Sequence, residues 1–447
     1  MILNSLVFKN IFLYSIKIFI FLIFLFGRTF MGINFFGFKL GELLMGFTAL
    51  ILIIIFLIFP LIFKKHLFNK KISTSFIILI FSFILINFKN DISLLNLTIY
   101  KNSSYIWTFG GIAIGFLLSK IHPKIFNKID IYFSLFSLFL IYIYTTKGIS
   151  ENRQNFLLNF SDKFEYLKGS DVLLALIIIL YFVLFKLNFS NSAFNVLLIS
   201  SALFIPLFLY KSRSSFFSYI IFLTFLLLFF RNKKLQLNRV NKVFFLIAIL
   251  VFLISTNWVV SRDIVLDSDI SEELKYAITN RYSTINDNKY EKEVLELSLF
   301  YFKNNRIYTT DGNLNWRFQI WQDVIGDLTS SQQIGLGYGF HEIIPAMNSD
   351  QRYGEDQLNI HVHNYLIHIL SRGGLLHLGI IFYLYISLYQ VFKLKNLERN
   401  YLMLTIPILF NSLFDPSMEN SHYPIIYFIM LGLIINNDKI FTEELKT

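Results

Sequence analysis

Long runs of hydrophobic residues dominate the chain, and short polar links separate them. A helix that crosses a lipid bilayer needs about 20 apolar residues, with a range of about 17–25. Twelve runs predict such helices, at residues 8–26, 41–63, 72–88, 103–119, 129–146, 171–187, 193–210, 214–230, 241–258, 374–393, 401–415 and 422–436. The last two are short. Only Lys211-Ser212-Arg213 separates the seventh run from the eighth, which predicts either a helical hairpin or one broken helix.

One long polar segment, Val259–Val362, interrupts this pattern. It contains enough aromatic bulk to pack, so we expect it to fold. Helical spacing over Glu291–Lys303 and Asn315–Leu328 predicts two helices within it. The following run Gly335-Leu336-Gly337-Tyr338-Gly339 predicts an irregular backbone. No βαβ unit surrounds these glycines, so they do not indicate a dinucleotide-binding loop.

The composition is typical of a membrane protein. Of the 447 residues, 55% are hydrophobic and 15% are charged, whereas a soluble domain has about 25% charged residues. We therefore expect an all-α, polytopic membrane protein with about 12 transmembrane helices and one large helical external loop. Three parts are predicted: residues 1–258 form a bundle of about nine helices, residues 259–362 the loop, and residues 363–447 about three further helices.

The charge pattern gives a predicted orientation. The formal net charge is +11, but the long polar segment holds 9 Lys/Arg against 16 Asp/Glu, so the rest of the chain carries +18. With the N-terminus inside, the inner links hold 19 Lys/Arg and the short outer links hold 10. This bias predicts both termini inside and the polar segment outside, and nucleic acid is not an expected partner. The first run lacks a small-residue cleavage site and is expected to remain as a helix.

The strongest candidate for chemistry is the stretch His361–Asn364, where the polar segment meets the next apolar run. Ionisable groups at such a boundary are costly and often functional. Imidazole titrates near neutral pH, so His363 could accept a proton from a hydroxyl group. Asn364 could orient that imidazole, or the pair could simply cap the following helix. A zinc site of His361 and His363 with His341 lacks a further ligand at a recognised spacing, and no metal is expected.

Two arginines are candidate phosphate ligands. Arg213 lies between two apolar runs at the predicted outer face, and Arg317 shares a helix face with Trp321. A guanidinium binds phosphate oxygens through a fork of N–H donors. The alternatives are snorkelling of Arg213 to lipid headgroups and stacking of Arg317 on an aromatic ring. Asp415 and Glu419 could balance these charges, help to bind an acceptor, or be simple loop charges. The absence of cysteine excludes disulfides and thiolate chemistry.

Taken in order, these features resemble the O-antigen ligase and O-antigen polymerase superfamily of bacterial inner-membrane glycosyltransferases. The resemblance covers about residues 200–436. It rests on Ser212-Arg213, on Arg317 with Trp321, on the run Gly335 to Phe340, on His363-Asn364 followed by Gly374, and on Asn411 to Asp415. The ligase signature expects Gly, Thr or Tyr where this chain has His377.

The resemblance implies an inverting glycosyltransferase that needs no metal and no cofactor, with its active site at the periplasmic face of the inner membrane. The donor would be a glycan linked to undecaprenyl pyrophosphate, and the acceptor a second glycan or lipid A–core. His363 would be the catalytic base, Arg213 and Arg317 would bind the pyrophosphate, and Asn364 and His361 would contribute to substrate binding. Membrane lipids, a flippase and a chain-length regulator are the further partners implied.

A polymerase and a ligase would need the same base and the same cations. The imperfect ligase signature favours a polymerase, with the ligase as the alternative. A transporter of lipid-linked glycans would show charged or broken helices near mid-membrane, often in repeated halves, which this sequence lacks. A purely structural scaffold would leave the two arginines and His363 unexplained.

Overall fold

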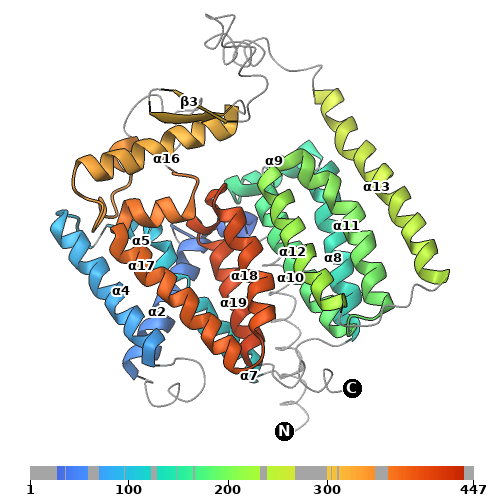
Figure 1. Cartoon of the computed structure of the whole chain (residues 1–447), viewed down its shortest axis with the longest axis horizontal. Coiled ribbons are helices and arrows are strands. Elements are labelled where there is room, and N and C mark those ends of the chain that lie inside the picture. Colours follow the sequence, from blue (N-terminus) through green and yellow to red (C-terminus); the bar gives the residue numbers. More distant parts are fainter. Residues whose placement is uncertain are drawn as a thin grey trace, which may run out of the picture. The chain divides into compact units, whose positions relative to one another are not determined.

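The computed structural model describes residues 28–35, 37–58, 70–94, 96–121, 128–147, 150–164, 167–231, 239–266, 300–303, 305–309, 312–347 and 361–436. These residues are mostly helical, and two short hairpins make up the sheet among them (Figure 1). The chain divides into two compact units, residues 1–77, 104–259 and 383–447, and residues 78–103 and 260–382. The predicted three-part division follows membrane topology and stays a prediction.

The helices of the first unit are α2 (Leu40–Ile58), α6 (Ser104–Trp107), α7 (Gly110–Ile121), α8 (Lys128–Lys147), α9 (Glu151–Leu158), α10 (Gly169–Lys186), α11 (Asn191–Lys211), α12 (Arg213–Arg231), α13 (Arg239–Leu266), α18 (Glu398–Ser412) and α19 (His422–Asn436), with the short elements β1 (Asn34–Phe35), β2 (Phe38–Lys39), η1 (Asp162–Phe164) and η4 (Pro416–Glu419). The second unit holds α5 (Leu97–Asn102), β3 (Phe300–Lys303), β4 (Arg306–Thr309), α16 (Gly312–Ser330) and η2 (Pro345–Met347). Three helices contribute residues to both units: α4 (Lys70–Lys89), α17 (Tyr365–Leu394) and α13, whose residues 260–266 belong to the second unit.

Most of the predicted helices are found. The run at 8–26 lies outside the described residues, and each of the other eleven runs falls on helix in the structure, the run at 103–119 on both α6 and α7. At Lys211-Ser212-Arg213, the sequence allowed either a helical hairpin or one broken helix. Ser212 is extended, with φ −159°, and the hydroxyls of Ser201 on α11 and Tyr219 on α12 lie 2.9 Å apart. The two helices therefore form a hairpin, beside α8 and α10 (Figure 1).

Among the described helices, four are long and apolar enough to cross a membrane: Gly169–Lys186, Asn191–Lys211, Asn241–Val259 and Tyr365–Leu394. Six further apolar helices are shorter, so the expected number of about 12 spans is not confirmed. The span in α13 has only 17% of its residues buried despite its apolar sequence. Such an exposed apolar surface is suited to contact with lipid.

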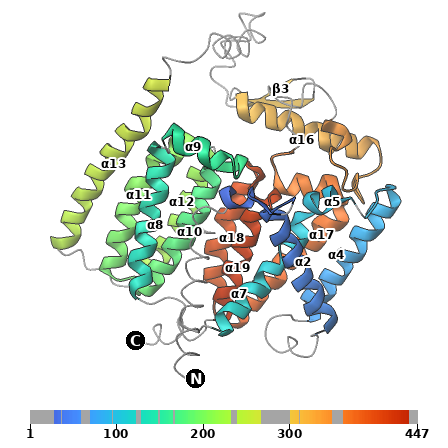
Figure 2. The ribbon, with the colours of Figure 1, turned by 180° about the vertical axis from the view of Figure 1, so that it is seen from behind.

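Close backbone contact joins α7 and α19 (Figure 2). A Cβ added to Gly115 would overlap the backbone carbonyl of Ile429, and one added to Gly432 would overlap the carbonyl of Ile112. In a membrane, small residues at a helix interface allow the backbones to approach and gain dispersion contacts. The glycines of these two apolar runs therefore determine how α7 packs against α19.

Helix α16 is the centre of the second unit. It confirms the predicted helix at Asn315–Leu328 and buries Ile320, Val324 and Leu328, which recur every four residues. They form a core with Val362 and with residues of the glycine-rich loop and η2. The apolar face of α16 thus determines where the loop and the 361–364 segment lie.

The predicted helix over Glu291–Lys303 is wrong in its described part. Residues 300–303 form strand β3, which pairs antiparallel with β4 from Phe300–Thr309 to Lys303–Arg306. Aromatic side chains favour strands when a partner strand is present. The side-chain amide of Gln322 then extends the ladder, accepting from the N–H of Ile307 at 2.7 Å and donating to its carbonyl at 2.9 Å. Sequence spacing alone could not reveal these partners.

The glycine run has the irregular backbone that the sequence predicts. Gly337 and Gly339 have φ of 69° and 82°, and Gly374 inside α17 has φ 65°. The two irregular segments contact each other, because the N–H of Tyr338 donates to the carbonyl of Ser371 at 2.8 Å. Glycine is the residue that adopts positive φ without steric cost. This packing fixes the loop against the break in α17.

Candidate functional site

Asn364 begins helix α17. Its side-chain oxygen accepts hydrogen bonds from the N–H groups of Leu366 at 3.0 Å and Ile367 at 3.1 Å. The first N–H groups of a helix have no partner inside the helix, and an asparagine at this position supplies one. Of the two roles left open for Asn364, helix capping is the one that the structure shows.

His363 precedes this cap in a left-handed backbone conformation, with φ 58°. Its ring lies edge-on to Trp316 of α16, with ring centroids 5.2 Å apart, and the ring of His361 is 6.4 Å away. One residue earlier, the carbonyl of Val362 accepts a hydrogen bond of 2.9 Å from the indole N–H of Trp321. Two tryptophans of α16 therefore fix a half-buried imidazole at the start of α17.

Arg317 belongs to the same turns of α16. It is half-buried, lies directly after Trp316, and is four residues from Trp321, so it shares a helix face with that indole. The structure thus brings the turn that carries Arg317 against the His361–Asn364 segment. These two motifs lie more than forty residues apart in the sequence, and their meeting depends on the core of the second unit.

Arg213 lies in the first unit, where it is the exposed first residue of α12. The preceding Ser212 accepts a hydrogen bond from the N–H of Ser215 at 3.3 Å. A Cβ added to Gly169 of α10 would lie 2.6 Å from the Ser212 side chain, so the two backbones are in close contact. The predicted convergence of Arg213 with Arg317 and His363 stays a prediction.

A polar network in the first unit was not predicted from the sequence. His422 Nε2 at the start of α19 lies 2.9 Å from Asp171 of α10. Ser170 donates to Asp415 at 3.3 Å. In the same layer, the hydroxyl of Ser215 donates to the side-chain oxygen of Asn411, at 3.3 Å.

This network joins two motifs of the resemblance, Ser212-Arg213 and Asn411 to Asp415, at the N-terminal ends of α10, α12 and α19. Asp415 is therefore a hydrogen-bonded residue of this layer. Polar residues at the ends of apolar runs signal such a layer, but the sequence does not indicate which residues pair.

Arg372 is a further residue to which the sequence analysis gave no role. Only 2% of its surface is exposed, and its guanidinium donates to the backbone carbonyls of His341 and of Glu342, the latter at 3.3 Å. The amide of Asn102 donates to the same His341 carbonyl at 2.6 Å. Burial and the Arg372 guanidinium lower the pKa of His341 below its usual value, so this imidazole is neutral at neutral pH. Arg372 thus ties the loop after the glycine run to α17.

His377 occupies the position where the ligase signature expects a small residue or tyrosine. It is buried, and its Nε2 lies 2.8 Å from the hydroxyl of Ser82 on α4. Space for the ring comes from Gly373, because a Cβ there would overlap the imidazole. The departure from the signature is therefore accommodated by its neighbours in the second unit.

In its described part, the chain brings no group of three or more His, Cys, Asp and Glu close enough to hold a metal ion. The fold and site define a helical membrane protein in which a half-buried histidine lies where a polar segment meets an apolar helix.

Residues 194–384 match the family model Wzy_C, described as O-antigen ligase. The matched segment contains Arg213, Arg317, the glycine run and His363-Asn364. This match confirms the resemblance to the O-antigen ligase and polymerase superfamily. Members of the family are enzymes that act on lipid-linked glycans. No curated protein matches the chain significantly.

Proposed function

We propose that the protein is a glycosyltransferase of the bacterial inner membrane that polymerises lipid-linked oligosaccharide repeat units at the periplasmic face. The observation that carries the proposal is the histidine held against α16 by Trp316 and Trp321, in the turns that also carry Arg317. It lies within the segment that matches a family of enzymes acting on lipid-linked glycans.

In the proposed reaction, the donor glycan is joined to undecaprenol through a pyrophosphate. Arg213 and Arg317 bind the pyrophosphate and stabilise the negative charge that develops as it leaves. His363 accepts the proton of an acceptor hydroxyl while that oxygen attacks the anomeric carbon. The glycosidic bond forms as the bond between that carbon and the phosphate oxygen breaks, and this single displacement inverts the configuration.

The environment of His363 is suited to this role. A non-glycine residue in the left-handed region carries strain of about 1–3 kcal/mol, which persists only where the surroundings enforce it. The Asn364 cap and the bond from Trp321 to Val362 enforce it here. The imidazole is thereby oriented before any substrate binds, and preorganised groups are the ones that lower a barrier.

Reconstitution tests the glycosyltransferase function directly. The full-length protein in lipid vesicles is mixed with the polyprenyl-pyrophosphate-linked glycan extracted from its host, and new glycosidic bonds are measured by mass spectrometry. We expect longer lipid-linked glycans and released polyprenyl pyrophosphate. Movement of intact lipid-linked glycan across the vesicle membrane, with no new bond formed, would contradict the proposal and favour a transporter.

A ligase is the second candidate, because the matching family model is described as O-antigen ligase. Residue His377 in place of the expected small residue favours the polymerase. Deletion of the gene followed by gel electrophoresis of the lipopolysaccharide separates the two functions. Cores capped with a single repeat indicate a lost polymerase. Uncapped cores, with lipid-linked polymer accumulating, indicate a lost ligase.

A further inference from the structure

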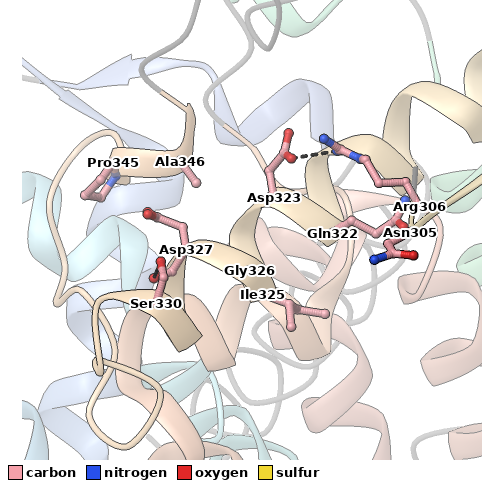
Figure 3. A pocket seen from close by; sticks show the side chains of 10 residues that line it. All are labelled: Asn305, Arg306, Gln322, Asp323, Ile325, Gly326, Asp327, Ser330, Pro345 and Ala346. Carbon is pink, nitrogen blue, oxygen red and sulfur yellow. Dashed lines mark hydrogen bonds and ion pairs between the residues drawn. The ribbon is translucent and has the colours of Figure 1, made fainter. Parts of the chain in front are cut away.

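An open groove lined by both polar and apolar residues runs along the C-terminal half of α16 in the second unit (Figure 3). Its volume is about 790 Å³. The turn of the β3–β4 hairpin forms one wall, α16 the floor, and η2 the other wall. The groove is distinct from the His361–Asn364 segment, and nothing in the proposed mechanism uses it.

Two carboxylates lie in this groove, and each accepts a hydrogen bond from a different kind of donor. Asp323 accepts a 2.6 Å hydrogen bond from the guanidinium of Arg306, which also donates to the carbonyl of Gln319. Asp327 accepts a 2.6 Å hydrogen bond from the hydroxyl of Tyr338, a buried residue of the core. Burial and the Asp327 carboxylate raise the pKa of Tyr338 above its usual value, so the phenol stays protonated and keeps donating. The polar groups of the groove are therefore fixed in position.

This combination of groups indicates the class of ligand. A carboxylate fixed by one bond retains lone pairs for other donors, and a guanidinium carries five N–H donors. Two carboxylates disfavour a phosphate, and Arg306 disfavours a cation. The fixed carboxylates and the guanidinium do not suit an acyl chain, whereas the apolar lining residues can pack against the C–H faces of a sugar ring. Hydroxyl groups, which both donate and accept, match fixed groups of both kinds.

The groove also lies on the correct flank of α16 to meet the proposed reaction centre. Trp316, Asp323 and Asp327 are spaced by seven and four residues, so they fall on one stripe of the helix. Trp316 contacts the ring of His363. With a rise of 1.5 Å per residue, Asp323 is about 10 Å along the helix from Trp316. A short oligosaccharide that reaches His363 can therefore extend along this stripe into the groove.

We propose that this groove binds sugar residues of the glycan substrate at a distance from the bond that is made. The inference rests on the proposed function for the identity of the substrate. The same chemistry is present in the lipid-linked donor and in the acceptor glycan, and the experiment below distinguishes them.

Gly326 offers a steric test. This residue is exposed in the floor of the groove, and a Cβ added to it meets no described atom within 4 Å. Glycine inside a helix costs about 0.5–1 kcal/mol relative to alanine, so packing does not require it here. Gly326→Leu fills the groove without disturbing the described core. Thr329→Leu is the matched control, because Thr329 is exposed on the same helix and does not line the groove.

The measurement is steady-state kinetics of the full-length protein in nanodiscs, with the host's lipid-linked glycan as donor and as acceptor, varied separately. We expect Gly326→Leu to raise one KM by about tenfold or more, equivalent to about 1.4 kcal/mol of binding, with kcat little changed. Thr329→Leu keeps the wild-type values. A raised donor KM assigns the groove to the donor, and a raised acceptor KM assigns it to the acceptor.

A direct binding measurement keeps the two proposals separable. Saturation-transfer NMR with the oligosaccharide released from its lipid by mild acid should show contact with the wild type and with Thr329→Leu, and loss of contact with Gly326→Leu. Equal contact in all three proteins, with both KM values unchanged, would overturn the proposal that the groove binds sugars. The proposed catalytic role of His363 would be unaffected. Full activity of His363→Ala would instead overturn the proposed mechanism. The NMR contacts would still show whether the groove binds the oligosaccharide.

Discussion

His363 is positioned by its two neighbours in the chain and by two tryptophans of α16. The residue after it caps α17, the residue before it is bonded to Trp321, and its own ring rests against Trp316. Its backbone has a left-handed φ of 58°. A change of side chain at this position should therefore affect chemistry far more than folding.

We predict that His363→Ala lowers glycosyl transfer by roughly 10²–10⁴-fold, the contribution of a general base, while the protein remains folded and inserted in the membrane. His341→Ala is the matched control. Asn102 and Arg372 bond to the backbone carbonyl of His341, and its side chain is exposed, so wild-type activity is expected. Mass spectrometry of the glycan products and thermal unfolding measure the two effects. Wild-type synthesis by His363→Ala would remove this histidine from the mechanism.

Arg317 provides a second residue-level prediction. Arg317→Lys keeps the positive charge but loses the forked pair of donors that binds two phosphate oxygens at once. We expect activity to fall by about 10²-fold, comparable to the loss of one preorganised donor. Arg399→Lys, at an exposed position on α18, should have no effect. If Lys at position 317 supports full activity, bidentate binding of the pyrophosphate is wrong.

At the scale of elements, α16 connects the two sites of the second unit. Its first turns contact the His361–Asn364 segment, and its last turns form the floor of the groove. Its buried residues Ile320, Val324 and Leu328 belong to one hydrophobic core. That core holds the helix, and with it both sites, in place. A tilt of this helix would displace the His361–Asn364 segment and the groove together, which is why substitutions outside the core make cleaner tests.

Helices α7 and α19 pack through glycines, so their backbones lie in direct contact. We predict that Gly115→Ala destabilises the protein by about 1–3 kcal/mol, as overpacking does in a close-packed interior, because the new Cβ overlaps a backbone carbonyl of α19. Gly46→Ala on α2 is the control, since an added Cβ there meets no described atom within 4 Å. Thermal unfolding in detergent measures both. Equal melting temperatures would show that α7 and α19 are not packed through their glycines.

At the scale of the whole molecule, the motifs are distributed over both units. Ser212-Arg213 and the Asn411 to Asp415 run lie in the first unit, and they are joined by the bond between Ser215 and Asn411. The residues Arg317 and His363 lie in the second. The proposed reaction requires these two sets to meet at one substrate.

The absence of cysteine makes this requirement testable by cross-linking. We predict that Arg213→Cys combined with His363→Cys is joined by a short bifunctional maleimide in native membranes. The pair Arg399→Cys with His363→Cys should not react, because the charge bias places residue 399 on the inner side. Gel mobility after cleavage between the two sites measures the link. Failure of the first pair would contradict a shared pyrophosphate site.

Several features could be predicted from the sequence because their causes are local. A segment in lipid must satisfy its backbone hydrogen bonds internally, so long apolar runs form helices whatever surrounds them. The irregular backbone at Gly337 and Gly339 follows from the conformational freedom of glycine. The match of residues 194–384 to the family follows from motifs that can be read in order.

Other features depend on partners that are distant in the chain, and only the tertiary structure decided them. Asp171 pairs with His422, and Ser82 with His377, because helix packing brings their side chains together. Residues 300–303 are a strand because they pair with β4, whose other edge is bonded by the amide of Gln322 at Ile307. The groove along α16 likewise exists only where a hairpin, a helix and a loop meet. Local composition determines the elements, whereas the pairing of polar groups depends on how those elements pack.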